Sequence, residues 1–251
     1  MSEPEKKPFF VGYLPAPPEL RTFLIVTIVS FIVIFGATGL IIGATQDDPG
    51  PGAGYGRQTV TGIVEMLPYP VVHVTEGSDR LAVGRTVLLS SAGKNGAVGR
   101  AEPLAGQAAQ VSGLLLNRGE MDMIQLRGGQ NGMQAAEGTG TLPEPEPLGR
   151  WRLAGEICDG KCYAGIMRPG RGLAHRACAD LCISGQIPPV FVSTQPVEGS
   201  EFLLVTGPDG GFLPQEGYDA IAEYISVEGE ITRHGDLLVF AMDPATIEVL
   251  P

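Results

Sequence analysis

One stretch without a charged side chain, residues 22–44, limits most strongly what the N-terminal part of this chain can become. As a helix rising about 1.5 Å per residue, it spans a hydrocarbon layer roughly 30 Å thick. A cleaved signal peptide is the alternative, but the apolar region of such a peptide is usually only about 7–15 residues long. We therefore predict a transmembrane helix over residues 22–44, preceded by a polar tail over residues 1–21.

The charges on either side of this stretch predict its orientation. Lys6 and Arg21 precede it, whereas Asp47 and Asp48 follow it and no cation comes before Arg57. Because segments rich in Lys and Arg tend to stay in the cytoplasm, the N-terminus is expected there. The sequence thus predicts a single-pass protein of the bacterial inner membrane, with the rest of the chain in the periplasm.

Three glycines of the predicted span, Gly36, Gly39 and Gly43, fall on one helical face. Small residues allow a second transmembrane helix to approach closely. Ordinary glycines of a membrane helix are the alternative interpretation. The functional hypothesis is a packing face for a transmembrane partner or a second copy of the chain.

The composition of the chain favours a β-rich fold and argues against one class of partner, nucleic acids. The chain has 36 Gly and 21 Pro, and only 18% of its residues are charged, which favours short strands and turns over long helices. Its formal net charge of -11 repels phosphate backbones, which argues against nucleic-acid binding. Beyond the membrane helix we therefore expect an all-β protein.

Two segments of the chain resemble each other and predict an internal duplication. They cover residues 59–127 and 151–251, with a flexible stalk expected over 45–58 and a linker over 128–150. The second copy contains an insertion of 26 residues that the first copy lacks, and it lies between the first two strands of the second copy. The matched positions are Gly62 with Gly155, Pro70 with Pro189, Val87 with Leu203, Val111 with Val227, Gly113 with Gly229, and Gly119 with Gly235.

Each copy is expected to contain five short strands with a helix between the third and the fourth. This order resembles that of an OB-fold barrel, and a generic β-sandwich is the alternative. We therefore predict two tandem OB-like barrels. In the second copy the strands are expected near 152–158, 190–193, 201–206, 225–232 and 236–241.

The insert over residues 158–188 holds all four cysteines of the chain. Two Cys-x3-Cys pairs are separated by fifteen residues, and a histidine lies three residues before the third cysteine. A short helix is expected over 173–183 and a tight turn around the first pair. The candidate site residues are Cys158, Cys162, Cys178, Cys182 and His175.

Two chemistries compete for these residues. In an oxidising compartment four clustered cysteines favour two disulfides, and cross-pairing of Cys158 with Cys182 and of Cys162 with Cys178 would constrain the most chain. The alternative is a metal site in which four cysteines, or three with His175, bind zinc or Cu(I). The x3 spacing differs from the x2 spacing of common zinc ribbons.

Other polar residues carry weaker signals. His73 and His234 have no partner in the sequence and are expected to be ordinary strand or turn residues. Asp159, Lys161 and Arg176, close to the cysteines, are expected either to form ion pairs or to lie on a solvated loop.

The insert resembles segments of single-span bacterial proteins of unknown function, a resemblance that implies no activity. The spacing is also superficially similar to the copper site of Sco-type assembly factors, but those use a thioredoxin fold, against which the predicted strand order argues. No catalytic motif is found. We expect a non-enzymatic accessory subunit of a membrane complex, respiratory or redox, with a disulfide-stapled recognition insert. A periplasmic factor for metal binding or electron transfer is the alternative.

Overall fold

The computed structural model describes residues 17–45, 50–138, 140–165 and 167–251. Contacts divide the chain into two units, Met1–Asp48 and Pro49–Pro251, which are considered separately below. The first sixteen residues of the predicted tail lie outside the described residues.

The described part of the first unit, residues 17–45, forms helix α1 (Pro18–Thr45). Proline suits the first helical position because its fixed φ matches the helix and it has no N–H to satisfy. The helix thus begins within the predicted tail, four residues before the predicted span. It is long and apolar enough to cross a membrane, judged by length and composition. No atom within 4 Å would obstruct a side chain at Gly36, Gly39 or Gly43.

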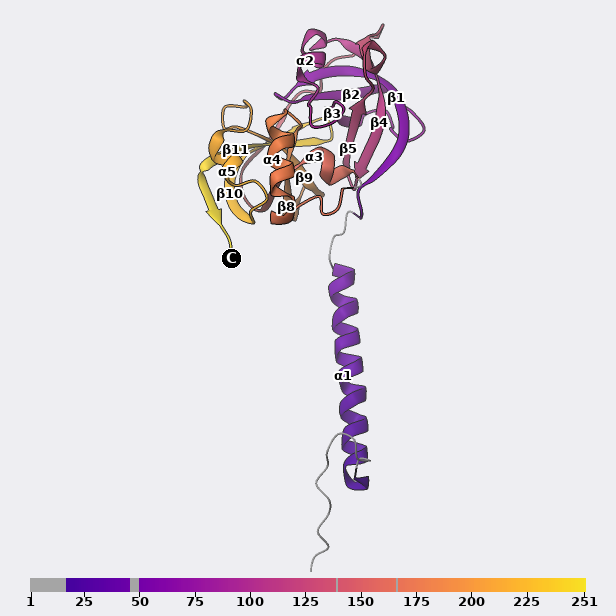
Figure 1. The fold of residues 1–251 in the computed structure, drawn as a ribbon, viewed down its shortest axis with the longest axis vertical. Coiled ribbons are helices and arrows are strands. Elements are labelled where there is room, and N and C mark those ends of the chain that lie inside the picture. Colours follow the sequence, from indigo (N-terminus) through magenta and orange to yellow (C-terminus); the bar gives the residue numbers. More distant parts are fainter. Residues whose placement is uncertain (1–16, 46–49, 139, 166) are drawn as a thin grey trace, which may run out of the picture. The chain divides into compact units, whose positions relative to one another are not determined.

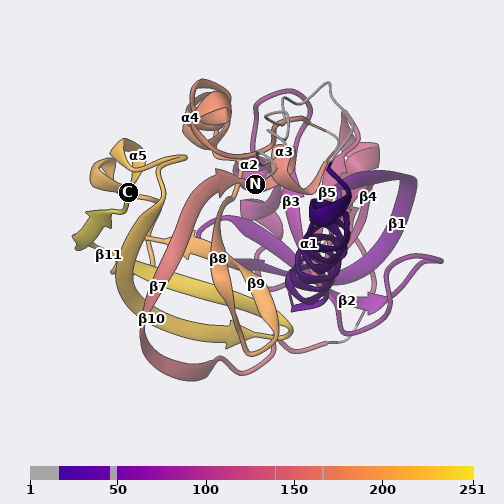
Figure 2. The same cartoon turned by 90° about the horizontal axis from the view of Figure 1, so that it is seen from below.

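The second unit is mainly β and contains two sheets that lie side by side (Figures 1 and 2). Short helices connect some of the strands. The strands of the first sheet are β1 (Ala53–Met66), β2 (Pro70–Glu76), β3 (Thr86–Ser90), β4 (Ala108–Arg118), β5 (Met121–Leu126) and β6 (Met133–Ala135). Those of the second are β7 (Glu146–Asp159), β8 (Pro189–Val197), β9 (Ser200–Thr206), β10 (Ile225–His234) and β11 (Leu237–Val249). The helical segments are α2 (Val98–Ala101), η1 (Glu102–Leu104), η2 (Gln130–Gly132), α3 (Gly160–Ala164), η3 (Leu173–His175), α4 (Arg176–Ser184) and α5 (Gln215–Asp219).

The two sheets have the same strand order. In the first, hydrogen bonds connect β1, β2, β3, β5 and β4 in that order, and β4 also pairs with β1. In the second, β7, β8, β9, β11 and β10 follow the same order, and β10 pairs with β7. The pairs β3–β5 and β9–β11 are parallel, and the other strand pairs of the two sheets are antiparallel. This is the agreement that an internal duplication predicts.

Two pairs of glycines matched between the copies occupy equivalent positions. Gly62 on β1 corresponds to Gly155 on β7, and Gly113 on β4 corresponds to Gly229 on β10. At each of them a Cβ atom would lie closer than 3.0 Å to a carbonyl oxygen of the neighbouring strand. Only glycine allows two backbones to approach so closely.

The structure differs from the prediction in the stretches expected to lack structure. Strand β1 begins at Ala53, within the predicted stalk, and its first residues pair with β4. The predicted linker contains β6, which also pairs with β4, and the beginning of β7. The neighbouring strands supply hydrogen-bond partners there, which composition alone does not reveal.

Pro49–Pro251 form one compact unit, in which the two sheets share one buried apolar cluster. Side chains from both sheets meet in it, together with α3 of the insert. From the first copy come Tyr69, Val71, Leu88, Leu116, Met121 and Met123. From the second come Cys158, Tyr163, Ala164, Val190, Val192, Phe202, Leu204 and Val239.

A polar cluster also joins the two copies. Glu65 on β1 contacts His73 Nε2 at 2.6 Å and His234 Nδ1 at 2.9 Å, so both histidines have a partner that sequence reasoning missed. Thr86 contacts His73 Nδ1 at 3.1 Å, and its backbone N–H donates to Asp236. Burial alone would raise the pKa of Glu65, but the hydrogen bonds and charges of the two histidines outweigh it and lower the pKa to about 2.

Candidate metal centre in the insert

The insert leaves the second sheet at the end of β7 and returns at the start of β8, where the sequence predicts it. Asp159 ends β7 and caps α3, because its Oδ1 accepts a hydrogen bond from the backbone N–H of Cys162 at 2.8 Å. A short helix therefore replaces the predicted tight turn. The predicted helix over 173–183 is present as η3 followed by α4.

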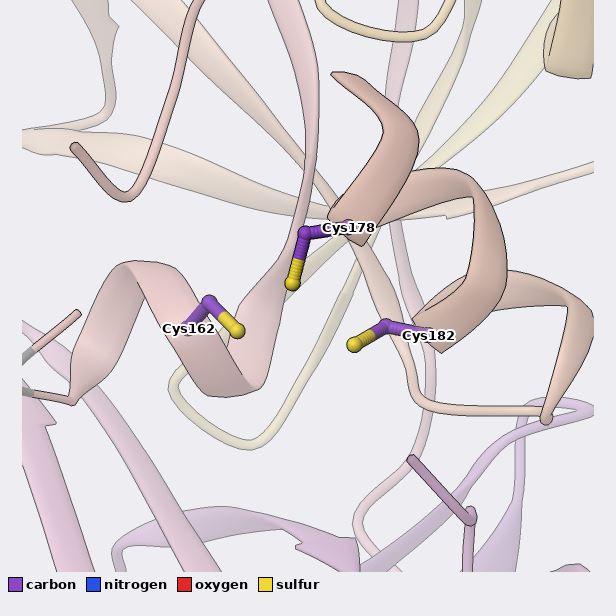
Figure 3. Close-up of side chains that lie close together, drawn as sticks. All are labelled: Cys162, Cys178 and Cys182. Atoms are coloured by element: carbon purple, nitrogen blue, oxygen red, sulfur yellow. The ribbon is translucent and has the colours of Figure 1, made fainter. Parts of the chain in front are cut away.

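Three of the four cysteines converge. Cys178 and Cys182 lie one turn apart on α4, and Cys162 faces them from α3 (Figure 3). The three sulfur atoms lie within 4.8 Å of one another. Cys182 is buried, and the other two are half-buried. Helical spacing brings Cys178 and Cys182 together on α4, and the packing of α3 brings Cys162 next to them.

Cys158 lies elsewhere, which corrects the sequence prediction. Its side chain is 1% exposed and belongs to the apolar cluster between the sheets, beside Tyr163 and Val190. All four cysteines are free, so neither predicted bridge, Cys158–Cys182 or Cys162–Cys178, is present. The strand directs Cys158 into that core, away from the three converging sulfurs.

His175 lies beside the cysteines but is held by Asp159. Its Nε2 is 2.9 Å from Asp159 Oδ2, and both side chains are buried. Donor atoms of Asp159, Cys162 and His175 form a second group within 4.8 Å, which shares only Cys162 with the three sulfurs. The histidine is therefore adjacent to one sulfur but is not part of the three-sulfur group.

A lysine from the first copy completes the surroundings of the sulfurs. Lys94, in the connection between β3 and α2, places its Nζ 2.8 Å from Cys178 Sγ and 3.4 Å from Cys182 Sγ. The same Nζ donates to the backbone oxygen of Cys178 at 3.1 Å. This lysine is 84 residues from Cys178, and no local pattern in the sequence points to it.

The loop that carries Lys94 is fastened to the insert at two further points. Lys161 Nζ donates to the backbone oxygens of Ser91 at 2.7 Å and Gly93 at 2.6 Å. The N–H of Gly96 donates to the oxygen of Gly185 at 2.6 Å. Lys161 thus fastens the loop instead of lying in solvent.

The other charged neighbour singled out in the sequence, Arg176, forms an ion pair with Glu223. Its guanidinium also donates to the backbone oxygen of Asp219 at 2.8 Å. Arg176 therefore holds the start of α4 against the segment that follows α5. Its contacts support the helix that carries two of the cysteines.

The cysteines differ in acidity. A hydrogen bond from the Cys162 thiol, with help from the Lys94 ammonium, lowers the pKa of Cys182 to about 7 against the opposing effect of burial. The same hydrogen bond, together with burial, raises the pKa of Cys162. Burial also raises the pKa of Cys158. The cluster thus favours a thiolate at Cys182 near neutral pH, whereas Cys158 is an inert thiol of the core.

The arrangement suits a thiophilic metal ion. Soft thiolate ligands favour zinc and Cu(I) over hard cations such as magnesium and calcium. Cys162, Cys178 and Cys182 would be the ligands, and Cys158 would not. His175 and Asp159 lie next to Cys162 and would hold α3 in position without binding the ion.

Comparisons with known proteins add no functional assignment to this geometry. The chemistry of the insert and the apolar helix α1 are therefore the evidence on which a function for this chain rests. The chain matches no family model, no curated protein and no solved structure.

Proposed function

We propose that this chain is a membrane-anchored, non-enzymatic protein whose insert binds one thiophilic metal ion, zinc or Cu(I). The observation that carries the proposal is the convergence of the sulfurs of Cys162, Cys178 and Cys182 within 4.8 Å. Thiolates bound to one ion at about 2.3 Å lie about 4 Å from one another, so little movement of the helices is needed. Two of the three cysteines, Cys162 and Cys178, are half-buried and not fully enclosed.

Contacts other than disulfides join the insert to the sheets and its helices to each other. Tyr163 of α3 is buried between the sheets, with the guanidinium of Arg118 4.1 Å from the centre of its ring. The Asp159–His175 pair joins the start of α3 to the start of α4. Free cysteines in a folded insert favour the metal-binding alternative over the stapled recognition insert.

The proposal extends to the fold of the body. We interpret each copy as an OB-like barrel, because both follow the same cyclic strand order and carry a short helical segment between the third and fourth strands. In such folds the loop after the first strand is a usual place for binding sites. The insert occupies that loop in the second copy.

One titration series tests the metal proposal. The reduced, full-length protein in mild detergent and without oxygen is expected to retain about one equivalent of zinc or Cu(I) after desalting. Cys182→Ala should lower retention to below about 0.1 equivalent, because two thiolates hold the ion far less tightly than three. The matched variant Cys158→Ala should retain the full equivalent. Retention is measured by elemental analysis.

Two outcomes would contradict the metal proposal. One is equal loss of the ion in Cys158→Ala and Cys182→Ala, since only the second residue belongs to the sulfur group. The other is a wild-type protein that binds neither ion and releases its thiols only after reduction, which would support a stapled insert.

The membrane helix supports an accessory role in a complex. We propose that α1 crosses the bacterial inner membrane with its N-terminus in the cytoplasm, as the flanking charges favour. The face formed by Gly36, Gly39 and Gly43 would then receive a transmembrane partner or a second copy of the chain. The complex would be a respiratory or redox assembly, in which bound metal has an evident use.

Leucine at both Gly39 and Gly43 is expected to disrupt this association, because the helices can no longer approach closely. Recovery of the associated subunit from mild detergent should fall by about tenfold. Ala37→Leu is the control, because Ala37 is also small but lies on a different side of the helix from the three glycines. Protease added to intact spheroplasts should digest the β-rich body of every variant, which verifies insertion and orientation. Protection of the body until lysis would contradict the orientation, and unchanged association would contradict the glycine face.

A further inference from the structure

The three-sulfur group has no fourth protein ligand among the neighbouring His, Cys, Asp and Glu side chains that the structure describes. His175 and Asp159 are bonded to each other, and their donor atoms group only with Cys162. Asp159 also accepts the hydrogen bond that caps α3, so moving it toward the sulfurs would uncap that helix. Structural zinc sites are almost always four-coordinate, whereas Cu(I) is well satisfied by three thiolates.

The net charge of the metal-bound site differs between Cu(I) and zinc. Three thiolates carry a charge of -3, so the site has a net charge of -2 with Cu(I) and of -1 with zinc. A nearby cation interacts with these complexes in proportion to their charge. It therefore favours the Cu(I) complex about twice as strongly, in free energy, as the zinc complex.

Lys94 is placed to supply this cation. Its Nζ lies 2.8 Å from Cys178 Sγ and 3.4 Å from Cys182 Sγ, and it donates to the Cys178 carbonyl as well. The loop around it is fastened to the insert through Lys161 and Gly96, as described above. The ammonium is thus held beside the sulfurs by the first copy of the duplicated fold.

We propose that the sulfur site selects Cu(I) over zinc, and that Lys94 is a specificity-determining residue for this choice. This inference rests on the proposed metal-binding function and names the ion that the site takes. The ammonium donates to the thiolates and offsets the charge of a three-coordinate complex without binding the ion itself. The site is therefore shared between the two copies: the second provides the ligands and the first provides the counter-charge.

The test is a competition experiment on the reduced full-length protein without oxygen. Cu(I) affinity is measured against a chromophoric Cu(I) chelator, and zinc affinity against a chromophoric zinc chelator. Lys94→Gln should lower the ratio of the Cu(I) affinity to the zinc affinity about threefold, because the two complexes differ by one unit of charge while the metal-free site is the same for both ions. Lys94→Arg keeps the charge and should leave this ratio unchanged. X-ray absorption at the copper edge should report three sulfur ligands and no imidazole.

The outcomes separate this inference from the proposed function. If Lys94→Gln weakens both ions equally or neither, or if copper shows an imidazole ligand, the selectivity proposal is wrong while metal binding stands. Equal losses in Lys94→Arg and Lys94→Gln would assign the effect to shape instead of charge and would also overturn it. A wild-type protein that binds neither ion overturns the proposed function itself. Circular dichroism of each variant checks that this exposed loop substitution leaves the fold intact.

Discussion

Replacing Asp159 by alanine is expected to destabilise the protein by about 4 kcal/mol, because breaking a buried pair leaves its partner without compensation. The Asp159 side chain is fully buried and accepts hydrogen bonds from the Cys162 backbone and from His175. Without the carboxylate, the N–H of Cys162 and the imidazole of His175 lose their partner. Since α3 carries Cys162, the three-sulfur group should be lost together with the cap.

The measurement for this variant is thermal and urea unfolding of the full-length protein in mild detergent, followed by circular dichroism. Asp159→Asn keeps an acceptor for the Cys162 N–H and should lose less stability than Asp159→Ala. Asp180→Ala is the matched control, because Asp180 is exposed on α4 and substitutions at such positions usually change stability by less than about 0.5 kcal/mol. If Asp159→Ala and Asp180→Ala unfold alike and both retain the ion, Asp159 does not organise the site.

Replacing Glu65 by glutamine is expected to remove about 3 kcal/mol of stability at neutral pH. The Glu65 side chain is 12% exposed, and its pKa is lowered from 4.5 to about 2 in the folded protein. A carboxyl group with a lowered pKa adds stability that is fully present above the unfolded value, near pH 4.5. That contribution is lost as the pH falls through about 2, because protonated Glu65 no longer pairs with His73 and His234.

Subtracting the pH profile of Glu65→Gln from that of the wild type removes the contributions of all other acidic residues to the free energy of unfolding. Wild type minus Glu65→Gln, measured as the free energy of urea unfolding, should have its full value at about pH 5 and fall towards zero between about pH 4.5 and 2. Glu76→Gln on the same sheet is the matched control, because Glu76 is exposed and its profile should follow the wild type. A constant difference across the whole range would mean that the ionised form of Glu65 has no special role in joining the two copies.

Local patterns in the sequence were sufficient for much of the architecture. An uncharged stretch of 23 residues predicts α1 because the bilayer imposes both length and polarity. The matched glycines predict the shared strand order, because a close backbone approach excludes every other residue at Gly155 and its counterparts. The spacing of Cys178 and Cys182 likewise places them on one helical face.

Local patterns were least reliable in stretches that pair with distant strands. The predicted stalk and linker are rich in glycine and proline, yet parts of both pair with β4. Composition reports how a segment behaves alone, whereas β4 supplies hydrogen-bond partners from elsewhere in the chain. Strand bounds at the ends of each copy therefore needed the structure.

The sequence by itself determined which side chains are available to the site, and only the tertiary structure decided which of them meet. Four equivalent cysteines become three ligand candidates and one core thiol, because Cys158 is directed between the sheets. Lys94 joins the sulfurs, and Glu65 joins two histidines, across more than 80 and more than 160 residues of sequence. Such contacts depend on how two folded copies pack against each other, and side-chain spacing along the chain carries no information about that packing.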